Sequence, residues 1–547
     1  MRDRRLRAGL LVLAAVLAAA CGRGDEEPAA PPGAAADDEG REVVLRRGNP
    51  GEPGTLDPQR AEEETSREII RDLFEGLVTE APDGSLVPGA AESWSVSDDG
   101  LTWTFTLRGS GRWSNGDPLT AADFVAGLRR AVDPATGSTS AALLSPIANA
   151  GAVIAGEAPV TSLGVDAPDE HTLVIELESP TPYLLGLLSN TFAFPVHGPS
   201  LQAHGAGHAR PGRLVSNGAY MLDDWQPQRH VRLKRNARFR SPPAIDVVYF
   251  FPLEDPAAEL NRYRADELDI TSQIPHSRFR WLKENLGEEL HVAPYLSTQF
   301  WMFNMHRAPF DDIRLRKALT MAVDRERLVE SVTGLGEVPA YGLVPPGTAN
   351  YTAQSFEWRD WPMERRLETA RALLGEAGYG PDRPLVFEVR YNTDENLRRV
   401  ATAVAAMWRE HLPVEATLVN EELRVMLAKR RDPALWEVMR LAWAGDYNDA
   451  SNFLEILPPG GAVDDTGFSD PEYVRLLEAA AAENDPAARR RLLEAAELIV
   501  LERYPILPLY YTVSKHLVKP WVKGFAPNVL NHVYSRHLSI DTAMRGF

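Results

Sequence analysis

The stretch Leu101-Thr-Trp-Thr-Phe-Thr-Leu107 alternates apolar and polar residues without interruption. Because successive side chains of a strand point to opposite faces, the alternation predicts a strand that buries Leu101, Trp103, Phe105 and Leu107. Asn115-Gly116 follows shortly afterwards and predicts a tight turn. We therefore expect this part of the chain to form a sheet with one buried face.

A helix is expected directly after the turn. Thr120-Ala-Ala-Asp123 resembles a capping box, and the apolar residues that follow recur at helical spacing. Elsewhere, alternation predicts strands and spacings of three and four predict helices: strands at 172–178 and 230–234, helices at 311–334, 362–378 and 485–504. This mixture of strands and helices, spread over 547 residues, predicts an α/β protein of two or three lobes.

The N-terminus has the order of a secretory signal peptide. Four arginines among the first seven residues precede an apolar run from Ala8 to Ala20, which ends at Cys21. Leu17-Ala-Ala-Ala-Cys21 resembles a bacterial lipobox, with Ala18 where leucine is more common. We expect residues 1–20 to be the signal peptide, and residues 21–40 to be a lipidated cysteine followed by a disordered tether that spans about 25 Å.

The formal net charge is −19, and it becomes −22 when residues 1–20 are removed. Such an acidic body is repelled by nucleic acid and by anionic lipid headgroups, so no nucleic-acid partner is expected. The acidity fits a soluble secreted protein.

Motifs that carry catalytic chemistry are missing from the sequence. There is no His-Glu-x-x-His, no Walker loop and no Gly-x-Ser-x-Gly. His197, His204 and His208 have spacings that suit metal ligands, but glycines and prolines surround them, so we expect a solvated loop and no metal or cofactor. An enzyme is not expected.

Two aromatic segments are candidates for ligand contacts: Phe300-Trp-Met-Phe-Asn304, and Arg440-Leu-Ala-Trp-Ala-Gly-Asp-Tyr-Asn-Asp449. The second begins like a strand and ends in a turn rich in carboxylates. Considered alone, Asp446 is more commonly a residue that caps a turn than one that contacts a ligand.

Several segments resemble the oligopeptide-binding proteins of bacterial ABC importers, which belong to the peptide and nickel group of solute-binding proteins. The resemblance runs from about Glu42 to about Asp541. Its strongest segment comprises Ala90-Ala-Glu-Ser-Trp94, Ser97-Asp-Asp-Gly100 and Trp103-Thr-Phe-Thr-Leu-Arg108. Other matches occur in the same order along the chain: Leu56-Asp-Pro58, Arg71-Asp-Leu-Phe-Glu-Gly-Leu77, Trp113-Ser-Asn-Gly116, Ser216-Asn-Gly-Ala-Tyr220, Asn261-Arg-Tyr-Arg264 and Lys519-Pro-Trp521. Asp446-Tyr-Asn448 is typical of the peptide-binding branch.

The resemblance implies the large type of two-lobed, hinged periplasmic-binding-protein fold, of the α/β class, with an extra subdomain inserted in lobe I. The expected bounds are 41–74, 201–292 and 515–547 for lobe I, 75–200 for the insert and 293–514 for lobe III, the second ligand-binding lobe. The crossings near 292 and 514 would form the hinge. Closure is required because an importer can distinguish loaded from empty carriers only if their shapes differ.

The resemblance also implies the binding residues. All peptides share an amine, a carboxylate and a repeating backbone, so a carrier of broad specificity binds those groups. The strands that would pair with the ligand backbone map to Glu62, Glu63 and Glu64 and to the segment from Ala442 to Ala444. Asp446 matches the carboxylate that pairs with the ligand amine in the family. Such a partner is needed because a buried unpaired ammonium costs several kcal/mol.

Three further residues complete the implied site. Trp443 would line a side-chain pocket, and Arg431 and Arg440 would approach the ligand carboxylate. The sequence lacks the histidine and the lysine that meet this carboxylate in some relatives, at Tyr391–Leu397 and Glu330–Gly334, and Thr139-Ser140 replaces a tyrosine. We therefore expect the ligand carboxylate to be held loosely.

The expected partners are short peptides, the permease subunits of an importer, and the membrane through the N-terminal lipid. The protein would be a monomer at the extracytoplasmic face of the cell membrane. Other readings are a carrier of another solute, such as a murein peptide, a glycoside or a metal chelate, and a surface sensor or adhesin without a transporter. An enzyme is the third reading.

Overall fold

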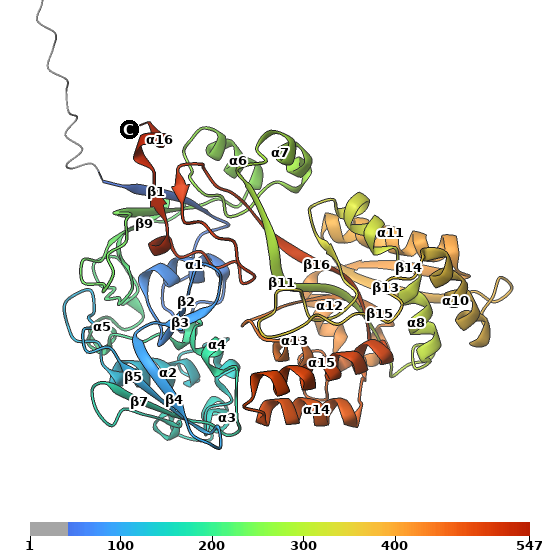
Figure 1. Ribbon diagram of the computed structural model, residues 1–547, viewed down its shortest axis with the longest axis horizontal. Coiled ribbons are helices and arrows are strands. Elements are labelled where there is room, and N and C mark those ends of the chain that lie inside the picture. The colour runs from blue at the N-terminus through green and yellow to red at the C-terminus, as the bar shows by residue number, and fades with distance from the viewer. Residues whose placement is uncertain (1–41, 547) are drawn as a thin grey trace, which may run out of the picture. The chain divides into compact units, whose positions relative to one another are not determined.

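The computed structural model describes residues 42–546, which form three main sheets with helices packed around them (Figure 1). Cys21 and the other N-terminal features predicted above lie outside these residues. No helix in the described range is long and apolar enough to cross a membrane.

The first sheet has the order β1-β10-β9-β8, formed by Val44–Asn49, Val247–Pro252, His230–Arg235 and Tyr220–Gln226. β1 and β10 are parallel, and the other neighbours are antiparallel. The strand predicted at 230–234 is thus confirmed as β9. Two separate antiparallel pairs of short strands are β2 and β3, at Val78–Glu80 and Leu86–Pro88, and β17 and β18, at Val522–Lys523 and Ser539–Ile540.

The second sheet contains the stretch with which the sequence analysis began. Its order is β4-β5-β7-β6, formed by Ala91–Val96, Thr102–Leu107, Thr172–Glu176 and Val165–Asp166. Trp103, Phe105 and Leu107 are buried as predicted. Leu101 is only half-buried, because it lies between the turn at Gly100, where φ is positive, and the first residue of the strand, Thr102.

The predicted capping box at the start of α2, Ala121–Val132, is confirmed. The Asp123 carboxylate accepts a hydrogen bond of 2.9 Å from the backbone nitrogen of Thr120. Phe124, Val125 and Leu128 then face the core. Asp485 likewise caps α15, Pro486–Arg503, by accepting from the backbone nitrogen of Ala488.

The third sheet has six strands in the order β12-β16-β11-β15-β13-β14, formed by Val338–Pro339, Ile506–Leu517, Leu290–Phe303, Val438–Ala444, Leu385–Asn392 and Val414–Glu421. β11 and β16 are its longest strands and pair with each other in antiparallel fashion. Figure 1 shows this pair continuing from the α6 and α7 region into the strands β13 and β15.

The predicted helix at 362–378 is confirmed as α10, whereas the one predicted at 311–334 is broken into three pieces. Ile313–Met321 forms α8, Arg325–Arg327 forms α9 and Leu328–Thr333 forms a π-helical turn. The break occurs because the Asp324 side chain accepts from the backbone nitrogen of Arg327 and so begins a new helix. The other helices are α1 Glu64–Leu73, α3 Ala150–Ile154, α4 Leu184–Leu188, α5 Gly198–His204, α6 Pro256–Arg264, α7 Phe279–Asn285, α10 Met363–Glu376, α11 Glu395–His411, α12 Leu423–Arg430, α13 Ser451–Leu454, α14 Pro471–Ala482 and α16 Thr542–Arg545.

Apolar side chains gather in separate cores. One core draws its buried residues from 45–270 and 518–538, and two others draw theirs from 296–530. Separate cores are expected when a chain is too long for one apolar interior.

Candidate ligand-binding site

The end of strand β15 has a free backbone edge. On one side β15 pairs with β11 from Val438 to Ala444. On the other side, within the described residues, its pairing with β13 stops at Met439. The backbone groups of residues 440–444 on that side are therefore available to an extended ligand. The small side chains of Ala442 and Ala444 leave space beside this edge.

Asp446 lies in the turn that follows β15. The backbone nitrogen of Asp446 donates to Asn452 Oδ1 at 3.3 Å, and Trp443 Nε1 donates to the same oxygen at 2.9 Å. The backbone after the turn is bound by a different carboxylate, because Asp449 Oδ1 accepts from the backbone nitrogen of Ser451 at 2.9 Å, and no side chain caps helix α13. The carboxylate of Asp446 is thus not needed as the cap.

Electrostatics make the Asp446 carboxylate receptive to a cation. Burial raises its pKa, and the charge of Arg67 and a hydrogen bond from Asn452 only partly oppose this increase. An ammonium group placed beside this carboxylate would compensate for the lost solvation.

The segment Glu62–Glu64 was expected to be a strand, and this prediction is wrong. Glu64 is the first residue of helix α1, and Glu63 is its N-cap residue, with extended backbone angles of −93° and 150°. The helix begins early because Glu64 is acidic and favours the positive end of the helix dipole. Glu62, Glu63 and Glu64 are exposed.

The side chain of Glu64 belongs to a chain of four polar groups. Arg71 donates to Glu64 and also to His532 Nε2, at 2.6 Å, and His532 Nδ1 lies 2.8 Å from Glu80. Because arginine only donates, Nε2 of His532 accepts from Arg71, and Nδ1 is left to donate to Glu80. The Glu64 side chain is still exposed to solvent; its partial desolvation tends to raise the pKa of the carboxyl, but the charge of Arg71 and the hydrogen bond from Arg71 outweigh this and lower the pKa.

Tyr295 links the two segments. Burial raises the pKa of its phenol, and the charges of Glu64 and Asp446 raise it further while Arg71 lowers it. The phenol therefore lies within the field of both carboxylates. The charges of Glu64 and Asp446, which are far apart in the sequence, thus both act on Tyr295.

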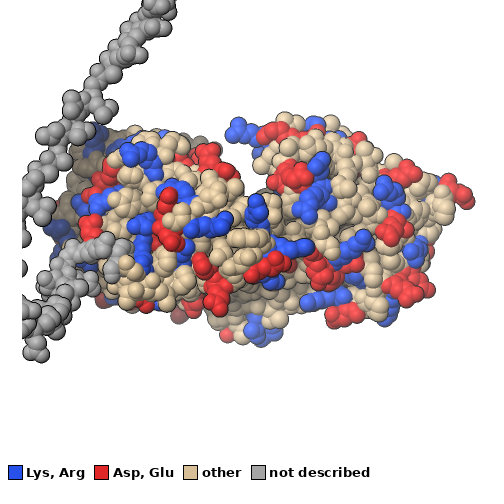
Figure 2. Space-filling view, turned by 90° about the horizontal axis from the view of Figure 1, so that it is seen from above, with Lys and Arg blue, Asp and Glu red and all other residues tan. Residues whose placement is uncertain are grey.

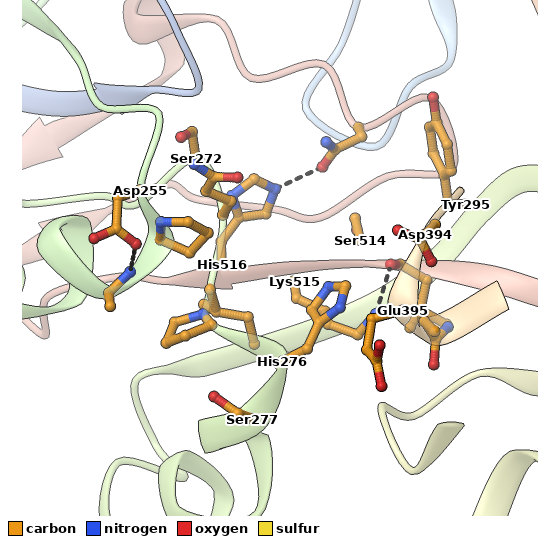
Figure 3. A pocket seen from close by; sticks show the side chains of 18 of the residues that line it. Asp255, Ser272, His276, Ser277, Tyr295, Asp394, Glu395, Ser514, Lys515 and His516 are labelled. Atoms are coloured by element: carbon orange, nitrogen blue, oxygen red, sulfur yellow. Dashed lines mark hydrogen bonds between the residues drawn. The ribbon is translucent and has the colours of Figure 1, made fainter. Parts of the chain in front are cut away.

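A cavity of about 800 Å³ adjoins Tyr295 (Figure 3). Residues 255–257 and 272–277 line one side, residues 394–399 line another, and residues 513–516 of β16 cross it. His276 and Lys515 point into it in Figure 3. Lys515 Nζ lies 3.5 Å from the buried Glu337, so its charge is already compensated.

A second cavity, of about 400 Å³, adjoins Asp446. It is lined by residues 80–86, by Pro182–Ser189 around helix α4, and by Asp446–Asp449. Asp446 thus lines the second cavity, whereas Glu62–Glu64 and Ala442–Ala444 line neither of the two.

The remaining predicted residues have other partners. Arg440 donates from Nη1 to Asn392 Oδ1 at 3.0 Å and from Nη2 to Gln299 Oε1. Arg431 is exposed at the end of α12, and its charge tends to lower the pKa of Asp465. Trp443 is half-buried, with its indole nitrogen bound to Asn452. A ligand carboxylate would have to displace Asn392 or Gln299 in order to bind Arg440.

Sequence reasoning missed Tyr295, Arg67, Arg71 and His532. Arg67 follows Glu64 by three residues, so a helix beginning at Glu64 would have placed both on one face. No local signal marks Tyr295 or His532, since their roles depend on contacts across more than 150 residues.

The histidine segment does not form a solvated loop, because His197 and His208 are buried. Gly198–His204 forms helix α5, and His197 Nδ1 accepts from the backbone nitrogen of Ser200. Within residues 42–546 no group of three or more His, Cys, Asp or Glu is arranged to hold a metal ion. Basic and acidic side chains are interspersed on the face shown in Figure 2.

Known protein families and solved structures resemble this chain over most of its length. The family model for bacterial extracellular solute-binding proteins, family 5, matches residues 85–464. The periplasmic oligopeptide-binding protein OppA of Escherichia coli is 36% identical over 536 residues, covering 97% of this chain and 98% of that protein. The periplasmic murein peptide-binding protein MppA of Escherichia coli is 38% identical over 494 residues, covering 89% and 91%.

Solved structures show the same fold. The unliganded open form of MppA has a TM-score of 0.84 and 37% identity, with 92% of this chain and 98% of that chain covered. OppA of Haemophilus influenzae in complex with the peptide RPPGFSPFR has a TM-score of 0.73 and 34% identity, with 92% and 99% covered. These likenesses confirm the expected α/β periplasmic-binding-protein fold.

The family consists of solute-binding proteins, which agrees with the prediction that the protein is not an enzyme. The match covers well over half of the chain, and the relatives are covered over nearly their whole length. The chain therefore belongs to family 5 of the bacterial extracellular solute-binding proteins, the OppA-like substrate-binding proteins of ABC importers.

Proposed function

We propose that this protein captures short peptides in extended conformation between two closing lobes and delivers them to the permease of an ABC importer. The observation that supports this most is the free edge of β15, which ends beside the half-buried carboxylate of Asp446. An extended peptide would pair with residues 440–444 and place its ammonium at Asp446. The backbone of Glu62 and Glu63 would contact its other side.

The proposed lobes are 41–74 with 201–292 and 515–547, carrying the insert 75–200, and 293–514. Both proposed crossings fall inside the paired strands β11 and β16. The two largest apolar cores support this division, because one draws its buried residues from 45–270 and 518–538 and the other from 301–510. Two paired strands that join two cores form a hinge that can bend without unfolding either core.

A thermal-shift screen with peptides of about two to ten residues tests the proposal. A ligand at 100 times its Kd stabilises the folded state by about 2.7 kcal/mol, so a true ligand should raise the Tm measurably. A screen in which no peptide raises the Tm, at concentrations up to the millimolar range, would reject the proposal.

A murein peptide is the second candidate ligand. The likeness to MppA, which is described as a murein tripeptide-binding protein, favours it. A murein tripeptide added to the same screen separates the two candidates, because the preferred ligand will give the larger shift at equal concentration.

Amidating the C-terminus of a bound peptide should change its affinity by only about 0–1 kcal/mol. Arg440 is already hydrogen-bonded to two neutral side chains, and Lys515 is paired with Glu337, so neither of these cations is free for the ligand carboxylate. Titration calorimetry on one peptide in free and amidated form measures the difference. A loss as large as that caused by acetylating the amine would reveal a cationic partner for the carboxylate.

We also propose that Cys21 is lipidated and holds the protein at the extracytoplasmic face of the membrane as a monomer. The apolar run that ends at Cys21 supports this. Cys21→Ser should move the protein from the membrane fraction to the soluble fraction, as followed by fractionation and immunoblotting. Ala36→Ser, a control in the proposed tether, should remain with the membranes. Equal partitioning of Cys21→Ser and the parent would contradict lipidation.

A further inference from the structure

The turn that carries Asp446 is held from two directions. Asn452, six residues later, accepts from the backbone nitrogen of Asp446 at 3.3 Å. Asn190, which is 256 residues earlier, donates from Nδ2 to the backbone oxygen of Asp446 at 3.0 Å. Both backbone polar groups of Asp446 are thus fixed by asparagine side chains from different parts of the chain.

Helix α4 and its flanks supply the second of these contacts. Asn190 Nδ2 also donates to the oxygen of Gly186 in α4, at 3.1 Å, which orients its amide. Tyr183, just before α4, stacks on Tyr447 with ring centroids 4.9 Å apart and planes inclined by 8°. Gly186 lies so close to Tyr447 that a Cβ at this position would be 3.1 Å from the Cβ of Tyr447.

We infer that α4 and Asn190 are the positioning element of the amine site, so that Asp446 binds a peptide amine tightly only while α4 is docked on its turn. This inference rests on the proposed function and assigns a role in ligand binding to the segment 182–190. Asn190 does not touch the ligand in this arrangement, and it acts through the backbone of Asp446.

The physical reason is preorganisation. A carboxylate fixed in its binding geometry loses little conformational freedom when the ammonium arrives. The partial burial of Asp446 also makes an ammonium partner more favourable than it would be in water. By linkage, a free amine at Asp446 must in turn stabilise the docked position of α4.

Asn190→Leu tests the inference, because leucine has a similar size and cannot donate a hydrogen bond. Calorimetry with one peptide in free and N-acetylated form should show about a tenfold loss for the free peptide. The acetylated peptide, which cannot use Asp446, should bind the variant and the parent alike. Asn285→Leu is the matched control, because Asn285 Nδ2 also donates to a backbone oxygen, that of Trp281 at 2.8 Å, outside this site.

Gly186→Ala provides a second variant that does not remove a polar group. Its added Cβ would push Tyr447 by a few tenths of an ångström and should likewise reduce the preference for the free amine. If both variants fold and keep the parent's ratio of free to acetylated affinity, the inference is wrong. If the parent itself binds no peptide, or does not distinguish the two forms, the proposed function fails instead.

Hydrogen exchange of the parent gives an independent measurement. The amides of residues 184–190 should exchange more slowly with the free peptide bound than with the acetylated peptide bound at equal saturation. Equal protection by the two ligands would show that the amine and α4 are not coupled, which would also overturn the inference.

Discussion

Asp446→Ala should weaken the binding of a free peptide by about 2–5 kcal/mol, the range for removing one partner of a buried charge pair. The carboxylate is half-buried, with its pKa raised by burial, and Arg67 is the cation that most influences it. Without Asp446 the ligand ammonium would lose its water and would have no fixed anion to pair with. Titration calorimetry on the parent and the variant measures the loss.

Acetylating the peptide amine should cost the parent a similar amount and cost Asp446→Ala little. Asp382→Ala, which removes an exposed carboxylate in the same proposed lobe, should bind as the parent does. Unchanged affinity in Asp446→Ala would remove the amine site from the model.

Acidification should have the same effect as the substitution. The ordinary pKa of an aspartate is 3.8, and burial raises that of Asp446. Protonation of Asp446 stabilises the unliganded fold but removes the charge that the amine needs, so affinity for the free peptide should fall as the pH approaches the raised pKa from above. The acetylated peptide should not show this fall, and subtracting its profile removes the contribution of Glu455, whose pKa burial raises to about 7.

Arg325→Ala should lower the free energy of unfolding by about 3–5 kcal/mol. Its fully buried guanidinium donates from Nε to the oxygens of Ala340 and Pro508, at 2.7 and 2.9 Å, and from Nη1 to those of Thr320 and Val323. Alanine would remove the Arg325 donors from these four carbonyl oxygens and leave a cavity beside Tyr341.

Urea denaturation followed by fluorescence measures the change. Arg327→Ala is the matched control, because Arg327 lies in the same helix α9 and is exposed, so its loss should cost less than about 0.5 kcal/mol. Similar midpoints for the two variants would contradict a stabilising role for Arg325.

The local elements were predictable where one short-range pattern acts alone. The alternation around Trp103 and the capping box at Thr120 each depend on neighbouring residues, and both were confirmed. The segment 311–334 was mispredicted because its apolar spacing continues through Asp324, while the side chain of Asp324 starts a new helix.

The site was less predictable than the fold. Asp446 and the strand before it were identified by resemblance, and their roles remain predictions. The contact between Arg71 and His532 joins residues 461 apart in the chain, and that between Asn190 and Asp446 joins residues 256 apart. No periodicity or spacing encodes such pairs, because they depend on how whole sheets are placed.

The paired strands β11 and β16 form an elastic connection between the two proposed lobes. A ribbon of two hydrogen-bonded strands stores bending as elastic twist, and its ladder need not open as it bends. The register of the ribbon shifts between Pro294 and Thr298, and an irregularity of this kind favours bending at that point. Tyr295 lies at this register shift and lines the larger cavity. A ligand that packs against Tyr295 would therefore act on the ribbon at the point where it bends most easily.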